Sequence, residues 1–190
     1  MSTVALTRRE LLSRRATPRR RHGARFLIAV VVLGIAAAAV AASEAVRSAE
    51  AAASALVIER LFGSDIYSWR DQVIYRLSED RFDVLALRIT VECTSLVVLV
   101  PLLIFAVGVL LITRVGIGRW TVSVLVAMSI VVTANIARIV TIAYSLREFG
   151  REGYGWSHTV IGTGIIAVAT VIAVITMLAI QSYKGHRRRG

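Results

Sequence analysis

Cysteine is almost absent from this chain of 190 residues, in which Cys93 is the single thiol. One thiol excludes an internal disulfide framework, and it leaves thiol–disulfide exchange without a resolving partner. Acidic residues are also scarce: 12 Asp and Glu stand against 23 Lys and Arg, a net charge of +11. Because 56% of the residues are nevertheless hydrophobic, charged and apolar residues must be segregated along the chain.

Long apolar runs are what the sequence has instead. A run of about 20 apolar residues is long enough to cross a bilayer as a helix. Two of the runs carry no charge on any face, which argues against surface helices of a soluble protein. The sequence therefore predicts an all-α integral membrane protein with four transmembrane helices, at residues 26–42, 94–113, 120–144 and 159–180.

The first run could also be a cleaved signal peptide. It follows a basic leader and ends in the small residues Ala41, Ala42 and Ser43. The leader is long and rich in arginine, and the alanine-rich pattern continues without a break. We therefore expect the segment to be retained as an anchor.

The placement of basic residues predicts the orientation. Residues 1–25 and 181–190 form a basic arm and a basic tail, and the loop between the second and third runs holds Arg114 and Arg119 without an acid. Since basic flanks stay in the cytoplasm, both termini are expected inside, around a single membrane domain at residues 26–180 in the cell membrane. The positive charge then suits anionic lipid, and nucleic acid is not an expected partner.

Residues 43–93 form the only sizeable segment predicted outside the lipid. An alanine-rich helix is expected over residues 43–61, prolonging the first span until Gly63 ends it. Ser64 and Asp65 could cap a second, amphipathic helix, which either lies on the membrane surface or packs on the ends of the spans. Its apolar stripe consists of Ile66, Trp69, Val73, Ile74 and Leu77.

Topology brings three chemically distinctive residues to the outer face. Cys93 precedes the second span, and His158 opens the fourth. The third span is expected to enter at Trp120 as an interfacial anchor, which places Arg138 in its outer third. No metal site or other cofactor is expected, because His22 and His186 fall on the opposite side from His158.

These residue types suit nucleophilic catalysis. A thiolate at Cys93 could attack a carbonyl, His158 could move the proton, and Arg138 could stabilise the thiolate and the oxyanion. Asn135 shares the helical face of Arg138 and could orient it or bind a substrate carbonyl. The structural alternatives are an inert thiol, an interfacial histidine and a buried ion pair of Arg138 with Glu92 or Glu148.

The same residues resemble a known family. Glu92-Cys93-Thr94-Ser95, then Asn135-Ile136-Ala137-Arg138, then His158 are similar to the motifs of the exosortase/archaeosortase membrane cysteine proteases, over residues 88–164. The resemblance implies that Cys93 is the nucleophile, Arg138 the stabilising cation and His158 the general acid/base. It further implies substrates that are exported proteins with a C-terminal tail, composed of a recognition motif, an apolar helix and a basic cluster.

The chain departs from the family pattern in two respects. Ser95 stands where the family usually has glycine, so its side chain is expected to affect how closely a substrate backbone approaches. Family members also commonly have more than four spans. Two other functions stay open: a non-enzymatic assembly or transport subunit with a structural Arg138, and an acyltransferase that forms a thioester on Cys93.

Overall fold

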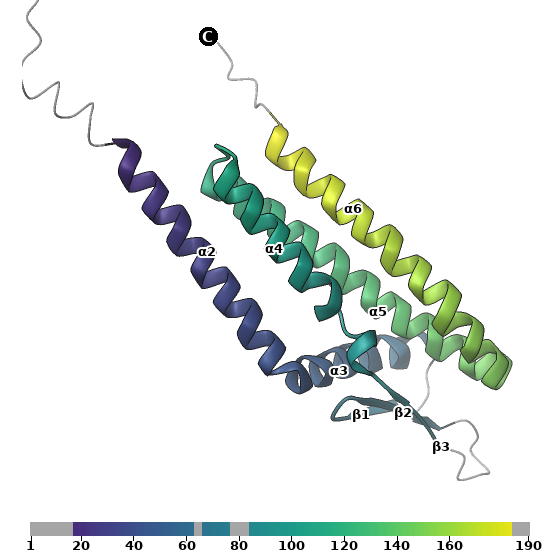
Figure 1. Ribbon diagram of the computed structural model, residues 1–190. Coiled ribbons are helices and arrows are strands. Elements are labelled where there is room, and N and C mark those ends of the chain that lie inside the picture. Colours follow the sequence, from purple (N-terminus) through teal and green to yellow (C-terminus); the bar gives the residue numbers. More distant parts are fainter. Residues whose placement is uncertain (1–16, 63–65, 77–83, 184–190) are drawn as a thin grey trace, which may run out of the picture.

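The computed structural model describes residues 17–62, 66–76 and 84–183 (Figure 1). Long helices dominate, and a small sheet lies at one end of them. In chain order the elements are α2 (Thr17–Ala41), α3 (Ser43–Phe62), β1 (Ile66–Trp69), β2 (Gln72–Arg76), β3 (Val84–Arg88), η1 (Val91–Cys93), α4 (Leu96–Ile112), α5 (Ile117–Trp156), η2 (Ser157–Ile161) and α6 (Gly162–Ser182).

Helices α2, α4, α5 and α6 run side by side with alternating directions (Figure 1). All four apolar runs are thus confirmed as helical. Among the described residues, three helical stretches are long and apolar enough to cross a membrane, at residues 23–41, 117–150 and 152–182, whereas α4 has 17 residues. Large apolar side chains remain exposed on these helices, as expected of surfaces that face lipid.

Residues 145–158, which separate the third and fourth predicted spans, are helical over most of their length. The chain reverses at Gly150, whose φ of 61° and ψ of −146° are open to glycine and strained for other residues. Helix resumes at once and leads into α6. Arg147 and Glu148, both about half exposed, extend α5 beyond the apolar layer, so their charges did not mark a loop.

Two arginine side chains cap helix ends on the side of the bundle opposite the chain reversal at Gly150. The guanidinium of Arg25 in α2 donates hydrogen bonds to the carbonyl oxygens of Leu110, Thr113 and Val115, where α4 ends. Arg119 donates in the same way to the carbonyl of Tyr183 after α6. The last carbonyls of a helix lack partners and carry partial negative charge, so cations stabilise them.

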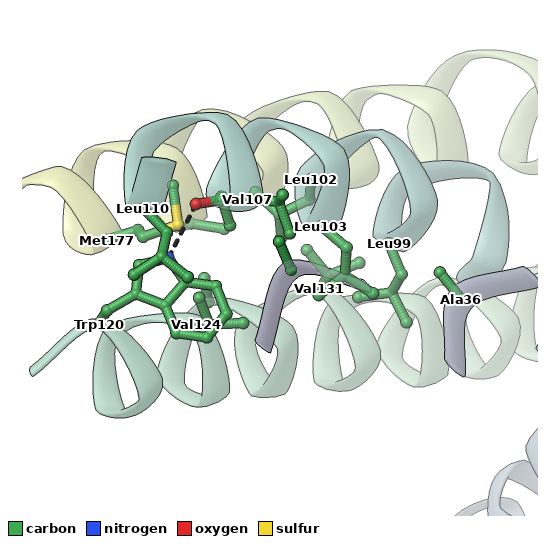
Figure 2. Packing of buried hydrophobic residues seen from close by; sticks show 14 residues of the cluster. Ala36, Leu99, Leu102, Leu103, Val107, Leu110, Trp120, Val124, Val131 and Met177 are labelled. Carbon is green, nitrogen blue, oxygen red and sulfur yellow. Dashed lines mark hydrogen bonds between the residues drawn. The ribbon is translucent and has the colours of Figure 1, made fainter. Parts of the chain in front are cut away.

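The core between α2, α4, α5 and α6 contains Trp120, which was expected to be an interfacial anchor. That prediction is wrong: Trp120 is only 3% exposed. Its indole Nε1 donates to the carbonyl oxygen of Ala106 at 2.8 Å, while its ring packs near Leu110 and Met177 (Figure 2). Burial is possible because the indole N–H, which needs an acceptor away from water, finds one in α4.

Helix α3 confirms the predicted helix over residues 43–61 but does not prolong α2. The chain bends at Ala42, and α3 turns toward the lower part of α5 (Figure 1). Its small residues Ala51 and Ala55 are buried against Ile139 and Ile142 of α5. Small side chains permit this close approach, and α3 therefore covers one end of the bundle.

The predicted second helix is wrong, since the chain forms an antiparallel sheet in the order β1-β2-β3. Trp69 pairs with Gln72 across a turn whose first residue, Arg70, has a φ of 52°. The β-branched and aromatic residues here suit a pleated surface, and this preference overrode the helical spacing. The fold is therefore helical with a small sheet, and Gly63, Ser64, Asp65 and Leu77 lie outside the described residues.

Asp71 ties the sheet to α3. Its carboxylate accepts a hydrogen bond from Arg88 at 3.1 Å and lies 3.8 Å from Arg47 of α3, while its carbonyl accepts from the amide of Ile89. Burial acts to raise the pKa of Asp71, but the hydrogen bond and charge of Arg88 and the charge of Arg47 outweigh it. The pKa of Asp71 therefore lies below its ordinary value of 3.8.

Candidate functional site

Three separate elements bring Cys93, Arg138 and His158 together at the end of the bundle that α3 and the sheet cover. Cys93 ends η1, a short turn whose amide at Cys93 donates to the carbonyl of Thr90. Arg138 projects from α5, and His158 lies in η2 at the start of the returning helix.

The three side chains are within interaction distance. The Sγ of Cys93 lies 3.3 Å from Nε2 of His158, and Nη2 of Arg138 lies 3.9 Å from the same sulfur. The second distance is long for a hydrogen bond, so the guanidinium acts on the sulfur mainly through its charge. Cys93 and Arg138 are 7% and 8% exposed, and such burial strengthens electrostatic interactions between the guanidinium and the sulfur.

His158 sits in a π-helical turn, a wide turn that is often found at functional sites. The ring of Tyr154 lies against the imidazole, with centroids 5.4 Å apart and planes tilted by 31°. Tyr154 precedes His158 by one helical turn, so the two rings share a face. This contact packs the ring of Tyr154 beside the imidazole and limits the space in which the imidazole can rotate.

Gly162 allows α6 to approach Arg138 closely. A Cβ atom at this position would lie 2.9 Å from Nε of Arg138 and 3.0 Å from the carbonyl oxygen of Ser157. Both distances are shorter than a normal carbon contact. The absence of a side chain at Gly162 therefore leaves the space that the stem of Arg138 occupies.

Arg138 has no carboxylate partner among the ion pairs of the described residues. Glu148 pairs instead with Arg147 at 3.9 Å, and the Nε of Arg138 is buried without a hydrogen-bond partner in the described part of the chain. A buried guanidinium with a thiol as its polar neighbour does not fit a simple structural ion pair.

An open cavity of about 420 Å³ gives access to this cluster. Arg138 and His158 line it directly, and both contact Cys93, which is not itself part of the lining. The walls combine charged, hydroxyl and apolar groups, a mixture typical of ligand-binding sites. The lining residues are Glu92, Arg138, His158, Thr159, Thr163, Ile166 and Ala167.

A comparison with known protein families shows the family to which the chain belongs. The model of the transmembrane exosortases matches residues 52–175, which is more than half of the chain and includes all three residues of the cluster. The protein belongs to the transmembrane exosortase family. No curated protein and no solved structure matches the chain.

Membership in the exosortase family, together with the long apolar helices, makes the chain a multi-pass membrane protein. Exosortases are generally cysteine transpeptidases, which suggests a role in protein sorting. Within the described residues, no group of three or more His, Cys, Asp or Glu side chains could hold a metal ion.

Asn135 and Ser95, which were expected to contact substrate, do not line the cavity of this exosortase. They are 1% and 3% exposed, respectively. The side-chain amide of Asn135 and the backbone amide of Ser95 both donate to the same carboxylate oxygen of Glu50 in α3, at 3.2 Å and 2.9 Å. Their substrate contacts stay predictions, and their observed contacts are internal.

The sequence did not identify three residues that contact the site: Glu50, Tyr154 and Gly162. Tyr154 and Gly162 stand one helical turn before and one turn after His158, and this spacing could have identified them. Glu50 lies among serine and alanine residues, where a glutamate is usually solvated, so the sequence carries no signal of its burial. Glu50 also lies just before the region that the family model covers.

Proposed function

We propose that this exosortase is a membrane cysteine protease or transpeptidase that removes C-terminal sorting tails from exported proteins. Cys93 is the nucleophile, His158 the general acid/base and Arg138 the cation that stabilises developing negative charge. The observation that supports this proposal best is the 3.3 Å separation between Sγ of Cys93 and Nε2 of His158. A nucleophile and its base need to lie within hydrogen-bond reach for this chemistry.

The reaction begins with proton transfer from the thiol to Nε2 of His158. The sulfur of Cys93 forms a bond to the carbonyl carbon of the scissile peptide, and the carbonyl π electrons move to oxygen. As the tetrahedral intermediate collapses, the C–N bond breaks and His158 returns the proton to the leaving amine. The products of this half-reaction are a thioester on Cys93 and the released tail.

The second half-reaction resolves the thioester. An acceptor amine attacks the acyl carbon, gives a proton to His158 and leaves the sulfur of Cys93 as the departing group, which completes transfer. Water in place of the amine gives hydrolysis. The cavity in front of His158 has room for either acceptor.

Arg138 stabilises the negative charge that develops in both half-reactions. Its guanidinium stays protonated in a water-poor site and presents several donors in a rigid plane. Arg138 lines the cavity, so its guanidinium is available to an oxygen of a bound substrate. In a partly desolvated site, one such donor to an oxyanion contributes about 3 kcal/mol to the transition state.

The proposed location is the outer boundary of the cell membrane. In the proposed topology, with four spans and both termini in the cytoplasm, the cluster faces outward; the capping of helix ends by Arg25 and Arg119 at the other side of the bundle supports this orientation. A substrate tail with an apolar helix and a basic inner end would span the membrane beside the enzyme. Its scissile bond would then lie at the depth of Cys93 and His158.

The test is co-expression with exported proteins that carry such tails. The native protein should shorten the substrate, whereas Cys93→Ala should leave it intact. Equal processing by both forms would rule out the proposed protease. Because Cys93 is the single thiol, mass spectrometry of a trapped intermediate can also identify its adduct: a peptide supports the proposal, and a fatty acyl chain indicates an acyltransferase.

A further inference from the structure

Glu50 is a buried acid that no part of the proposed chemistry uses. It is 7% exposed, and no ion pair of the described residues includes it. Removing a carboxylate from water without a cation is costly, so such a residue needs compensating hydrogen bonds and a reason to be present.

The compensation comes from one oxygen. Oε1 of Glu50 accepts from the backbone amide of Ser95 at 2.9 Å and from the side-chain amide of Asn135 at 3.2 Å. Oε2 has no partner among the described residues. A single atom of α3 therefore holds the start of α4 and the middle of α5 together.

These two donors are neighbours of the proposed catalytic groups. Ser95 follows Cys93 by two residues, and Asn135 precedes Arg138 by one helical turn on the same face of α5. The contact of Arg138 with the sulfur, at 3.9 Å, is already close to the longest distance at which a hydrogen bond to sulfur forms. A small displacement of η1 relative to α5 would therefore break it.

No other side chain in the described residues performs this task. The hydroxyl of Thr94 accepts from the next amide, that of Leu96, at 3.4 Å, whereas the side chain that accepts from the amide of Ser95 is Glu50. A carboxylate suits that position, because the amides at a helix start carry partial positive charge. Glu50 thus satisfies the amide just before α4 and links that segment to α5.

We propose that Glu50 is a positioning residue, whose carboxylate fixes the segment of Cys93 against the helix of Arg138. Asn135 acts through Glu50 and has no direct contact with substrate. This inference rests on the proposed function for its catalytic consequence, whereas the hydrogen bond to Ser95 can be measured without any substrate.

The first test compares three variants on a substrate tail. Glu50→Ala should lower kcat about 10-fold or more and leave KM within about twofold, because geometry is lost and binding is not. Glu50→Gln keeps the accepting oxygen and should retain most of the activity. Glu59→Ala removes an exposed acid of the same helix and serves as the matched control.

Asn135→Ala separates the two roles that Asn135 could have. As the partner of Glu50 it should lower kcat, and combining it with Glu50→Ala should add little further loss, because the two residues act as one unit. A rise in KM with unchanged kcat would indicate direct substrate binding and overturn this part of the inference.

The second test measures hydrogen exchange at the amide of Ser95 in detergent-solubilised protein. Exchange should be about 10-fold faster in Glu50→Ala than in the wild type, and unchanged in Glu50→Gln and Glu59→Ala. Thermal melting of each variant confirms that the exchange is measured on folded protein. If Glu50→Ala unfolds the protein, Glu50→Gln and Asn135→Ala still provide the kinetic comparison.

Two results would overturn the inference. The first is unchanged exchange at Ser95 in folded Glu50→Ala, which would mean that the hydrogen bond does not hold η1. The second is faster exchange with undiminished kcat, which would mean that the link stabilises the fold without positioning the site. Failure of the wild type to process any tail would instead refute the proposed function, and Ser95 exchange would then report the Glu50 contact alone.

Discussion

Replacement of Gly162 by alanine tests the geometry of the site with a single methyl group. The new Cβ would lie 2.9 Å from Nε and 3.2 Å from Cγ of Arg138. A comfortable contact is about 3.5 Å, so the guanidinium must move by roughly 0.6 Å. The 3.9 Å contact between Arg138 and the sulfur of Cys93 would be lost with this movement.

The expected loss of activity exceeds the expected loss of stability. A misplacement of about 1 Å costs roughly 100-fold in rate, so Gly162→Ala should lower kcat for tail processing about 10-fold. Crowding of a packed site costs about 1–3 kcal/mol, but alanine gains about 1 kcal/mol over glycine within a helix. The net change in the free energy of unfolding should therefore be about 0–2 kcal/mol.

Gly164→Ala is the matched control, because it adds the same methyl group to the same helix where nothing lies within 4 Å of the new Cβ. This variant should keep its activity and be equally or slightly more stable. The assay is tail processing in membranes, with thermal melting in detergent alongside. Wild-type activity in Gly162→Ala would show that Arg138 need not occupy its observed position, which would refute the role proposed for it.

Two further predictions concern charge. Arg138→Lys should lower kcat at least 10-fold although the charge is kept, because an ammonium group cannot present the planar array of donors; full activity in processing assays would argue against an oxyanion role. Asp71→Asn should lower the free energy of unfolding by about 0.5 kcal/mol at pH 7, as befits an ion pair with an exposed partner. Because the folded pKa of Asp71 is lowered, its contribution is present above the ordinary value of 3.8 and is lost as the pH falls through the folded pKa. Melting curves of both forms should therefore converge below about pH 4, and a constant difference at all pH values would exclude the ion pair as the cause.

The long helices and the meeting of Cys93, Arg138 and His158 could be predicted because both depend on length and order along the chain. A run of apolar residues fixes the approximate position of a membrane helix, and alternation of direction then decides which ends share a side. Cys93 and His158 stand at two such ends. Their proximity follows from topology without any knowledge of packing.

The sheet could not be predicted because its turn carries no recognisable signal. Tight hairpins usually have Asn-Gly or Asp-Gly at the turn, whereas here Arg70 adopts the left-handed conformation and Asp71 follows it. Contacts of Asp71 with Arg88 and Arg47 hold the turn in place, and both partners are distant in sequence. Information of this kind appears only once the chain is folded.

The polar network around Glu50 was missed for a related reason. A glutamate in an alanine-rich helix reads as a solvated residue, and only the packing of α3 on α5 places it beside Asn135. The amide of Ser95, its second partner, is a backbone group that no sequence pattern marks.

The arrangement also explains why a protein of membrane helices carries a sheet and a covering helix at one end. Arg138 and His158 belong to one continuous hairpin, so their relative position is set by the packing of α5 and α6. Cys93 belongs to a short turn that has no such support of its own. It is buried in a cluster formed by α3, the sheet and α5, which includes Val73 and Ile142. Substitutions in that cluster should therefore affect the reaction through the position of the sulfur, even where they lie far from the cavity.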